Sequence, residues 1–202
     1  MSAIRLIVGL GNPGTQYEGT RHNAGAFFVR RLAMLHGLTL SADRSALGDS
    51  ARGIVAGHDL RLLVPQTFMN DSGRSVATVA SYYRVDPTEI LIAHDELDIP
   101  PGESRIKHDG GHGGHNGLRD IIPALGNRKN FWRLRIGIGH PGSARQVSSW
   151  VLNKASTADQ TAIEASIESA ISALPLLLDG DAVKAMTALH SENHQPAANN
   201  ED

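Results

Sequence analysis

Short apolar runs alternate along this chain with longer segments whose apolar residues recur at helical spacing. Residues 4–10 form a short apolar run that leads into glycine-rich sequence, which is typical of a buried strand, and residues 24–36 have helical periodicity. Residues 47–64 predict two strands with a turn at Gly57 and His58. The chain therefore begins with a strand–loop–helix unit followed by a hairpin.

The second half of the chain continues this alternation. The expected elements are a helix over 71–83, a strand over 90–93, a helix over 115–125, a strand over 132–139, and helices over 157–178 and 181–189. We predict a single α/β domain over residues 1–189, with a twisted mixed sheet flanked by helices and a helical C-terminus. Residues 190–202 have almost no apolar side chains, which predicts a polar, disordered tail.

Length and composition restrict the classes of function. The chain has 202 residues, 41% of them hydrophobic, which is enough to bury one core. It has no cysteine, which excludes disulfides, thiolate nucleophiles and cysteine-ligated metals. No apolar run is expected to reach the ~18 residues of a membrane span, and the N-terminus lacks the pattern of a signal peptide. We expect a cytoplasmic protein with no membrane partner.

The positive charge is concentrated in the middle of the chain. The net charge is −2, but residues 103–145 hold eight Lys and Arg against three acidic residues, a net charge of +5. Arg133 and Arg135 share one face of the strand expected over 132–139, and phosphates could bind there. The stretch is a candidate polyanion-binding surface, although the count alone fits a solvated face of ordinary charges.

Four segments place unusual residues at the ends of the expected strands. The first, GLGNPG at residues 9–14, has the glycine spacing of a dinucleotide-binding loop. We reject that function because its third glycine should lie in a helix, whereas here a proline and further polar residues delay the helix. The loop instead places Asn12, Tyr17 and His22 near a strand end. His22 precedes a helix, whose positive end favours the neutral imidazole that a general base requires, although capping or packing also explains a lone histidine.

The second segment, PQTFMNDSG at residues 65–73, combines apolar and amide side chains in a turn. Phe68 and Met69 could wall a pocket, and Asn70 offers both a donor and an acceptor to an amide or ester. The alternative for Asn70 is to cap the helix that follows.

The third segment, HDELD at residues 94–98, has four ionisable groups in five residues after a strand. Asp95 is the candidate to hold the His22 imidazole in one tautomer and to stabilise its protonated form, as the acid of a catalytic triad does. An acidic loop without function is the alternative.

The fourth segment, GGHGGHNG at residues 110–117, has five glycines in eight residues. Such a loop is costly in conformational entropy and is typical of sites where backbone approaches a ligand. It precedes an expected helix, whose free N–H groups suit an anion or a developing oxyanion. The histidines at 108, 112 and 115 also suggest a metal site. We expect no metal, because the helical H-E-x-x-H pattern of zinc hydrolases is absent.

Taken in order, the chain resembles the bacterial peptidyl-tRNA hydrolases. The matching segments are GLGNPGTQYEGTRHNAG, PQTFMNDSG, HDELDIPPG, GGHGGHNGLRDI and FWRLRIGIGHPG, and the resemblance extends to about residue 189. It implies a single-domain α/β hydrolase that cleaves the ester between a peptide and the terminal ribose of tRNA. It further implies a monomer that rescues tRNA from aborted translation without a cofactor.

The resemblance also implies a role for each matching residue. The general base falls on His22, its supporting carboxylate on Asp95, and the asparagine that distinguishes peptidyl from aminoacyl substrates on Asn12. Positions that contact substrate or line its cleft are Tyr17, Phe68, Met69, Asn70, His115 and Asn116. The basic clamp for tRNA phosphates falls on Lys107, Arg135 and Arg105. The family has lysine at this last position, so the hydrogen-bond geometry there differs.

These roles imply water as the nucleophile. His22 would take a proton from the water, and the tetrahedral oxyanion would be stabilised by Asn70, Asn116 or N–H groups of the glycine-rich loop.

Two other classes of function remain. A nucleotide-dependent oxidoreductase would need an acidic residue at the end of a second strand, which we do not find. A non-catalytic RNA-binding protein would explain the basic stretch but not His22 and Asp95.

Overall fold

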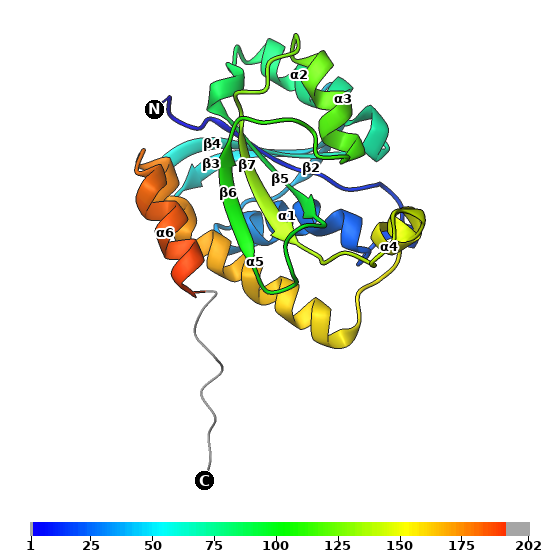
Figure 1. Cartoon of the computed structure of the whole chain (residues 1–202). Coiled ribbons are helices and arrows are strands. Elements are labelled where there is room, and N and C mark those ends of the chain that lie inside the picture. The colour runs from blue at the N-terminus through cyan, green and yellow to red at the C-terminus, as the bar shows by residue number, and fades with distance from the viewer. Residues whose placement is uncertain (1, 193–202) are drawn as a thin grey trace.

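One mixed sheet forms the centre of the molecule in the computed structural model, which describes residues 2–192 (Figure 1). The strand order is β2-β3-β4-β1-β5-β7-β6, with β4, β1, β5 and β7 parallel and the remaining strands antiparallel to their neighbours. The strands are β1 (Leu6–Gly9), β2 (Ser41–Asp43), β3 (Gly48–Val55), β4 (His58–Pro65), β5 (Ile90–Glu96), β6 (Ser104–His108) and β7 (Trp132–Gly137). Parallel central strands bring their carboxyl ends to one edge, where α/β proteins commonly build sites.

Helices cover both faces of this sheet, α2 and α3 on one side and α1, α5 and α6 on the other (Figure 1). Alternate residues of β1 enter the two cores, since Leu6 and Val8 pack toward α2 while Ile7 packs toward α1. The helices are α1 (Ala24–Leu35), α2 (Ser72–Tyr82), α3 (Asn116–Ala124), α4 (Val147–Leu152), α5 (Thr157–Leu178) and α6 (Ala182–Glu192). Short 3₁₀ turns η1 (Thr15–Tyr17), η2 (Arg21–Asn23) and η3 (Met69–Asp71) lie between elements.

The expected single α/β domain and its mixed sheet are confirmed. Three short elements were missed: β2, β6 and α4. The first two are edge strands with few buried side chains, and the third is a helix of only six residues, so none has a long apolar period. Helix α6 continues to Glu192, beyond the boundary expected at residue 189. The rest of the predicted tail, 193–202, lies outside the described residues.

Helix α5 is, within residues 2–192, long and apolar enough to cross a membrane by length and composition alone, contrary to the expectation that no run would be. In this fold it packs against the sheet and α6. Its buried side chains, including Ile167, Leu174 and Leu177, belong to the core on the α1 side of the sheet. Its apolar composition is therefore accounted for by burial against the sheet.

The beginning of α1 approaches the carboxyl ends of β1 and β5 so closely that only glycine fits. A Cβ at Gly9 would collide with the carbonyl oxygen of Gly25, and a Cβ at Gly25 would collide with the carbonyl oxygen of Ala93. The same junction is held by hydrogen bonds from Leu10 N to Ala93 O, at 3.0 Å, and from Ala26 N to Leu10 O, at 2.9 Å. This contact brings the turn before α1 next to the end of β5.

We predict that Gly25→Ala lowers the free energy of unfolding by about 1–3 kcal/mol or more. The added Cβ would collide with the backbone of Ala93, and no change of rotamer can relieve that collision. Urea denaturation followed by circular dichroism measures this. The matched control is Gly111→Ala, where an added Cβ meets nothing within 4 Å. We expect that variant to stay within about 1 kcal/mol of the wild type. Equal stability of the two variants would contradict the close-packing argument.

Candidate active site

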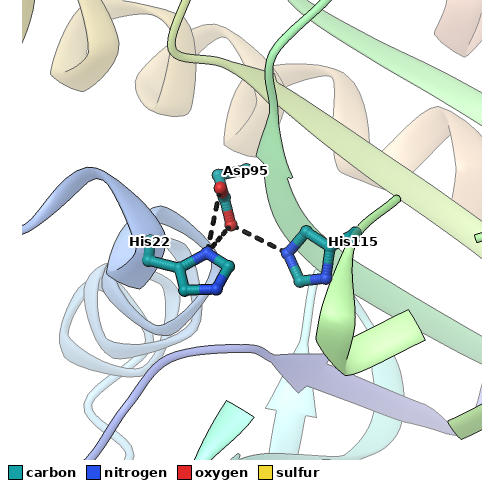
Figure 2. Close-up of side chains that lie close together, drawn as sticks. All are labelled: His22, Asp95 and His115. Carbon is teal, nitrogen blue, oxygen red and sulfur yellow. Dashed lines mark hydrogen bonds and ion pairs between the residues drawn. The ribbon is translucent and has the colours of Figure 1, made fainter. Parts of the chain in front are cut away.

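A buried carboxylate, Asp95, lies between two histidines at the carboxyl end of the sheet (Figure 2). His22 in η2 approaches with Nδ1, 2.9 Å from Oδ1 and 3.0 Å from Oδ2. His115, at the start of α3, approaches from the other side with Nε2, 2.8 Å from Oδ1. Three segments far apart in the sequence therefore meet at one side chain. The pairing expected between Asp95 and His22 is present, while the bond to His115 was not expected.

The hydrogen-bond network assigns the tautomers of both rings. Nδ1 of His115 accepts the backbone N–H groups of Gly117, at 3.1 Å, and Leu118, at 3.4 Å, as the cap of α3. Nδ1 is therefore unprotonated, and Nε2 carries the proton that it donates to Asp95. An ionised Asp95 can only accept, so His22 donates from Nδ1. Nε2 of His22 then carries a lone pair and has no hydrogen-bond partner among residues 2–192.

Charge and burial compete in setting the pKa values of this cluster. Burial by itself raises the pKa of Asp95, but the two histidines, through charge and hydrogen bonds, hold it well below the ordinary value. Burial lowers the pKa of His22, but the charge and hydrogen bond of Asp95 outweigh this, so the net shift is upward. The carboxylate thus stays ionised and favours the protonated form of His22.

The same three side chains have the composition of a metal site, since their ligand atoms lie within 4.8 Å of one another. The hydrogen bonds favour a different interpretation. A metal on Nε2 of His115 would force the ring proton onto Nδ1, which faces the N–H of Gly117. The cluster is therefore better satisfied as a hydrogen-bonded chain than as a set of metal ligands.

A cleft of about 770 Å³ opens beside the cluster. Its walls include nine residues that the sequence indicated, namely Asn12, Tyr17, His22, Phe68, Met69, Asn70, Asp95, His115 and Asn116. Tyr17 and Phe68 meet edge to face at 6.4 Å. Helix α4, which the sequence analysis missed, forms the remaining apolar wall. A second pocket of about 470 Å³, which shares Asn12 with the cleft, contains none of the three clustered side chains.

Asn12 lines the cleft, and three hydrogen bonds fix its orientation. Its backbone N–H donates to Oδ1 of Asn23 at 2.8 Å, and its carbonyl accepts from Nδ2 of Asn23 at 3.0 Å. Its side-chain Oδ1 accepts the backbone N–H of Met69 at 2.8 Å. The side-chain NH₂ of Asn12 is left as the donor. The role of Asn23 was missed, because a sequence does not show which backbone groups an amide will pair with.

His94 precedes Asp95 in β5 but lies within the protein, with 2% of its surface exposed. Its Nδ1 donates to the backbone carbonyl of Asp95 at 2.7 Å, and its ring meets that of His115 edge on, at 4.9 Å. Burial, and next the proximity of His115, lower the pKa of His94 to about 3. This histidine is therefore neutral, and it packs against the ring of His115 from within the protein. The strand continues through Glu96, so Asp95 is not in an acidic loop.

The basic residues lie on a neighbouring face of β6 and β7, where Arg105 pairs with Arg135 and Lys107 with Arg133 in register. Arg105 and Arg135 form ion pairs with Glu103 and Glu96, at 3.0 and 2.9 Å. None of Arg105, Lys107 and Arg135 lines the cleft.

The expectation of a phosphate-binding role was wrong for Arg133, which is 2% exposed. It donates to the carbonyl of Gly110 at 2.6 Å and packs over Phe131. Burial lowers its pKa to about 10. Arg133 therefore anchors the glycine-rich loop from within the protein.

Comparisons with known proteins identify the family of this chain. The family model described as peptidyl-tRNA hydrolase matches residues 6–197. The peptidyl-tRNA hydrolase of Pseudomonas putida is 57% identical over 192 residues, which cover 95% of this chain and 99% of that protein. That of Azotobacter vinelandii is 55% identical over 191 residues, covering 95% and 98%. A crystal structure of the Acinetobacter baumannii enzyme has a TM-score of 0.90 and 53% identity, covering 94% of this chain and 95% of that one. The chain belongs to the peptidyl-tRNA hydrolase family and is a hydrolase.

Proposed function

We propose that His22 is the general base in the hydrolysis of the ester between the peptide and the terminal ribose of tRNA, and that Asp95 orients and stabilises it. One observation carries the proposal: Asp95 fixes Nδ1 of His22 as a donor, which leaves the lone pair of Nε2 beside the cleft. A general base must be unprotonated at the atom that accepts the proton.

In the proposed reaction, Nε2 of His22 takes a proton from water while the oxygen attacks the ester carbonyl carbon. The imidazolium formed is stabilised by Asp95, as in a catalytic triad. Collapse of the tetrahedral intermediate breaks the bond to the ribose oxygen, which recovers the proton from His22. The products are a peptide with a free carboxylate and a tRNA with a free terminal hydroxyl.

Three asparagines at the cleft supply donors for this reaction. The free NH₂ group of Asn12 is the best placed, because its orientation is fixed by Asn23 and Met69. We propose that it reads a carbonyl of the peptide, which distinguishes peptidyl from aminoacyl substrates. Asn70 and Asn116 are exposed in the same cleft and are candidates for the oxyanion, together with the N–H groups of the glycine-rich loop.

We further propose that Lys107, Arg105 and Arg135 bind tRNA phosphates. These residues lie on β6 and β7, and β7 is the neighbour of β5, which carries Asp95. Contacts to phosphate do not depend on the base sequence of the tRNA. Any tRNA could then be accepted.

A substrate that arises during translation is consistent with the cytoplasm as the compartment. A site built from a single chain of one domain is consistent with a monomer that rescues stalled translation.

The first test compares hydrolysis of N-blocked aminoacyl-tRNA by wild type, His22→Ala and Asp95→Asn, with a chelator present throughout. We expect the first substitution to abolish measurable turnover. The second should lower kcat by roughly 10³- to 10⁴-fold, because an amide can donate to Nδ1 and move the ring proton to Nε2. Unblocked aminoacyl-tRNA is the control substrate and should remain uncleaved. Full activity of His22→Ala would mean that His22 is structural, and loss of wild-type activity in the chelator would indicate a metal.

The pH profile tests the electrostatic role of Asp95. Because the base must be neutral, kcat/KM should rise with pH as His22 loses its proton, with a midpoint above the ordinary histidine pKa of about 6.5. In Asp95→Asn the burial of His22 is no longer opposed, so the midpoint should fall below that value. The same midpoint in both proteins would show that Asp95 does not set the pKa of the base.

The basic face is tested by the salt dependence of tRNA binding. Lys107 has no ion-pair partner within the described chain, so it is free to contact phosphate. We expect Lys107→Ala to weaken binding of all tRNAs alike and to reduce the slope of log K against log salt by about 1. Arg128→Ala, whose guanidinium is paired with Asp86, is the control. An unchanged slope in Lys107→Ala would place the phosphate contacts elsewhere.

A further inference from the structure

Arg21, the residue before the proposed base, is buried although it carries a charge. Its side chain is 6% exposed, and it lies in η2 next to His22. Burial lowers its pKa, against the charge of Asp159, whose carboxylate is 3.7 Å away. A buried guanidinium is costly unless its donors are satisfied, so its partners identify what it holds in place.

Those partners lie in one segment of chain, the end of α4 and the residues that follow it. Nη1 of Arg21 donates to the carbonyls of Trp150, Asn153 and Lys154, at 3.3, 3.4 and 2.9 Å. The guanidinium also lies flat over the ring of Trp150, with its carbon 3.6 Å from the centroid. A positive charge at the carboxyl end of a helix is favourable in addition to these bonds.

The backbone makes the same connection. Arg21 N donates to Asn153 O at 3.2 Å, and Thr20 forms an isolated antiparallel bridge with Lys154. Trp150 in turn donates from its indole nitrogen to Gly139 O at 2.9 Å. The turn before α1, the end of α4 and the chain after β7 are therefore joined around the guanidinium of Arg21.

Helix α4 depends on these contacts for its position. It is six residues long, too short to be stable alone, and is preceded by a loop containing Gly139, Pro141 and Gly142. Its principal tertiary neighbour is η2, and Figure 1 shows it beside the blue chain that leads into α1. Four of its residues face the cleft, namely Val147, Ser148, Val151 and Leu152.

We propose that Arg21 is a positioning residue, which fixes α4 against η2 and so sets the width of the substrate cleft opposite the base. This inference rests on the proposed function of the cleft. Arg21 acts on substrate binding rather than on proton transfer, because His22 is oriented independently by Asp95. Lysine is not equivalent here, since an ammonium cannot lie flat over the indole ring of Trp150 as the planar guanidinium does.

Steady-state kinetics on N-blocked aminoacyl-tRNA provide the first arm of the test, with Arg21→Gln and Arg21→Lys. We expect KM to rise about 10-fold in both, a loss of about 1.4 kcal/mol in binding, while kcat stays within about threefold. The midpoint of the pH profile should not move. Asp159→Asn, which removes only the ion pair, should have a smaller effect on KM, and Arg128→Gln, remote from the cleft, should have none.

Hydrogen–deuterium exchange provides the second arm, which does not depend on activity. Loss of protection in Arg21→Gln should be confined to the segments around residues 20–23 and 147–154. The proposal is wrong if protection there is unchanged, if it falls across the whole sheet in both variants, or if kcat and the pH midpoint change while KM does not. A wild type that fails to hydrolyse the substrate would contradict the proposed function, and the exchange data would still decide whether Arg21 holds α4.

Discussion

The buried carboxylate of Asp95 is the interaction on which the site depends. An ionised group withdrawn from water must have its oxygens satisfied, and here the donors come from His22 and His115. Each histidine lies at the beginning of a helix on a different face of the sheet. One charge therefore connects β5, η2 and α3, and the same two bonds fix the tautomers that the proposed chemistry needs.

His22 and His115 can reach Asp95 because the helices that follow them lie very close to the carboxyl ends of the central strands. Gly9 and Gly25 have no side chain to separate α1 from the ends of β1 and β5. Gly117 similarly leaves room for Met69 and Leu10 beneath α3. In the motif that resembles a nucleotide-binding loop, Gly9 and Gly11 serve close packing against α1, and Gly14 adopts a positive φ. The glycine spacing therefore has a structural explanation that requires no cofactor.

The functions of the site are divided among separate layers. The histidine–aspartate cluster lies at the floor of the cleft, and Asn12, held by Asn23 and Met69, provides a donor with one orientation. The aromatic pair and α4 form apolar walls, while the basic residues occupy the adjacent strands β6 and β7.

The sequence by itself determined the α/β class, the long elements and nine of the residues that line the cleft, because apolar periodicity and the order of the motifs are local properties of the chain. Tertiary structure decided what depends on pairing across the fold. It gave His115 a bond to Asp95, buried Arg133 beneath the glycine-rich loop, and placed Arg21 against α4. The sequence pattern does not show whether a polar side chain faces solvent or donates to a backbone carbonyl. Only the packing of distant segments selects their partners.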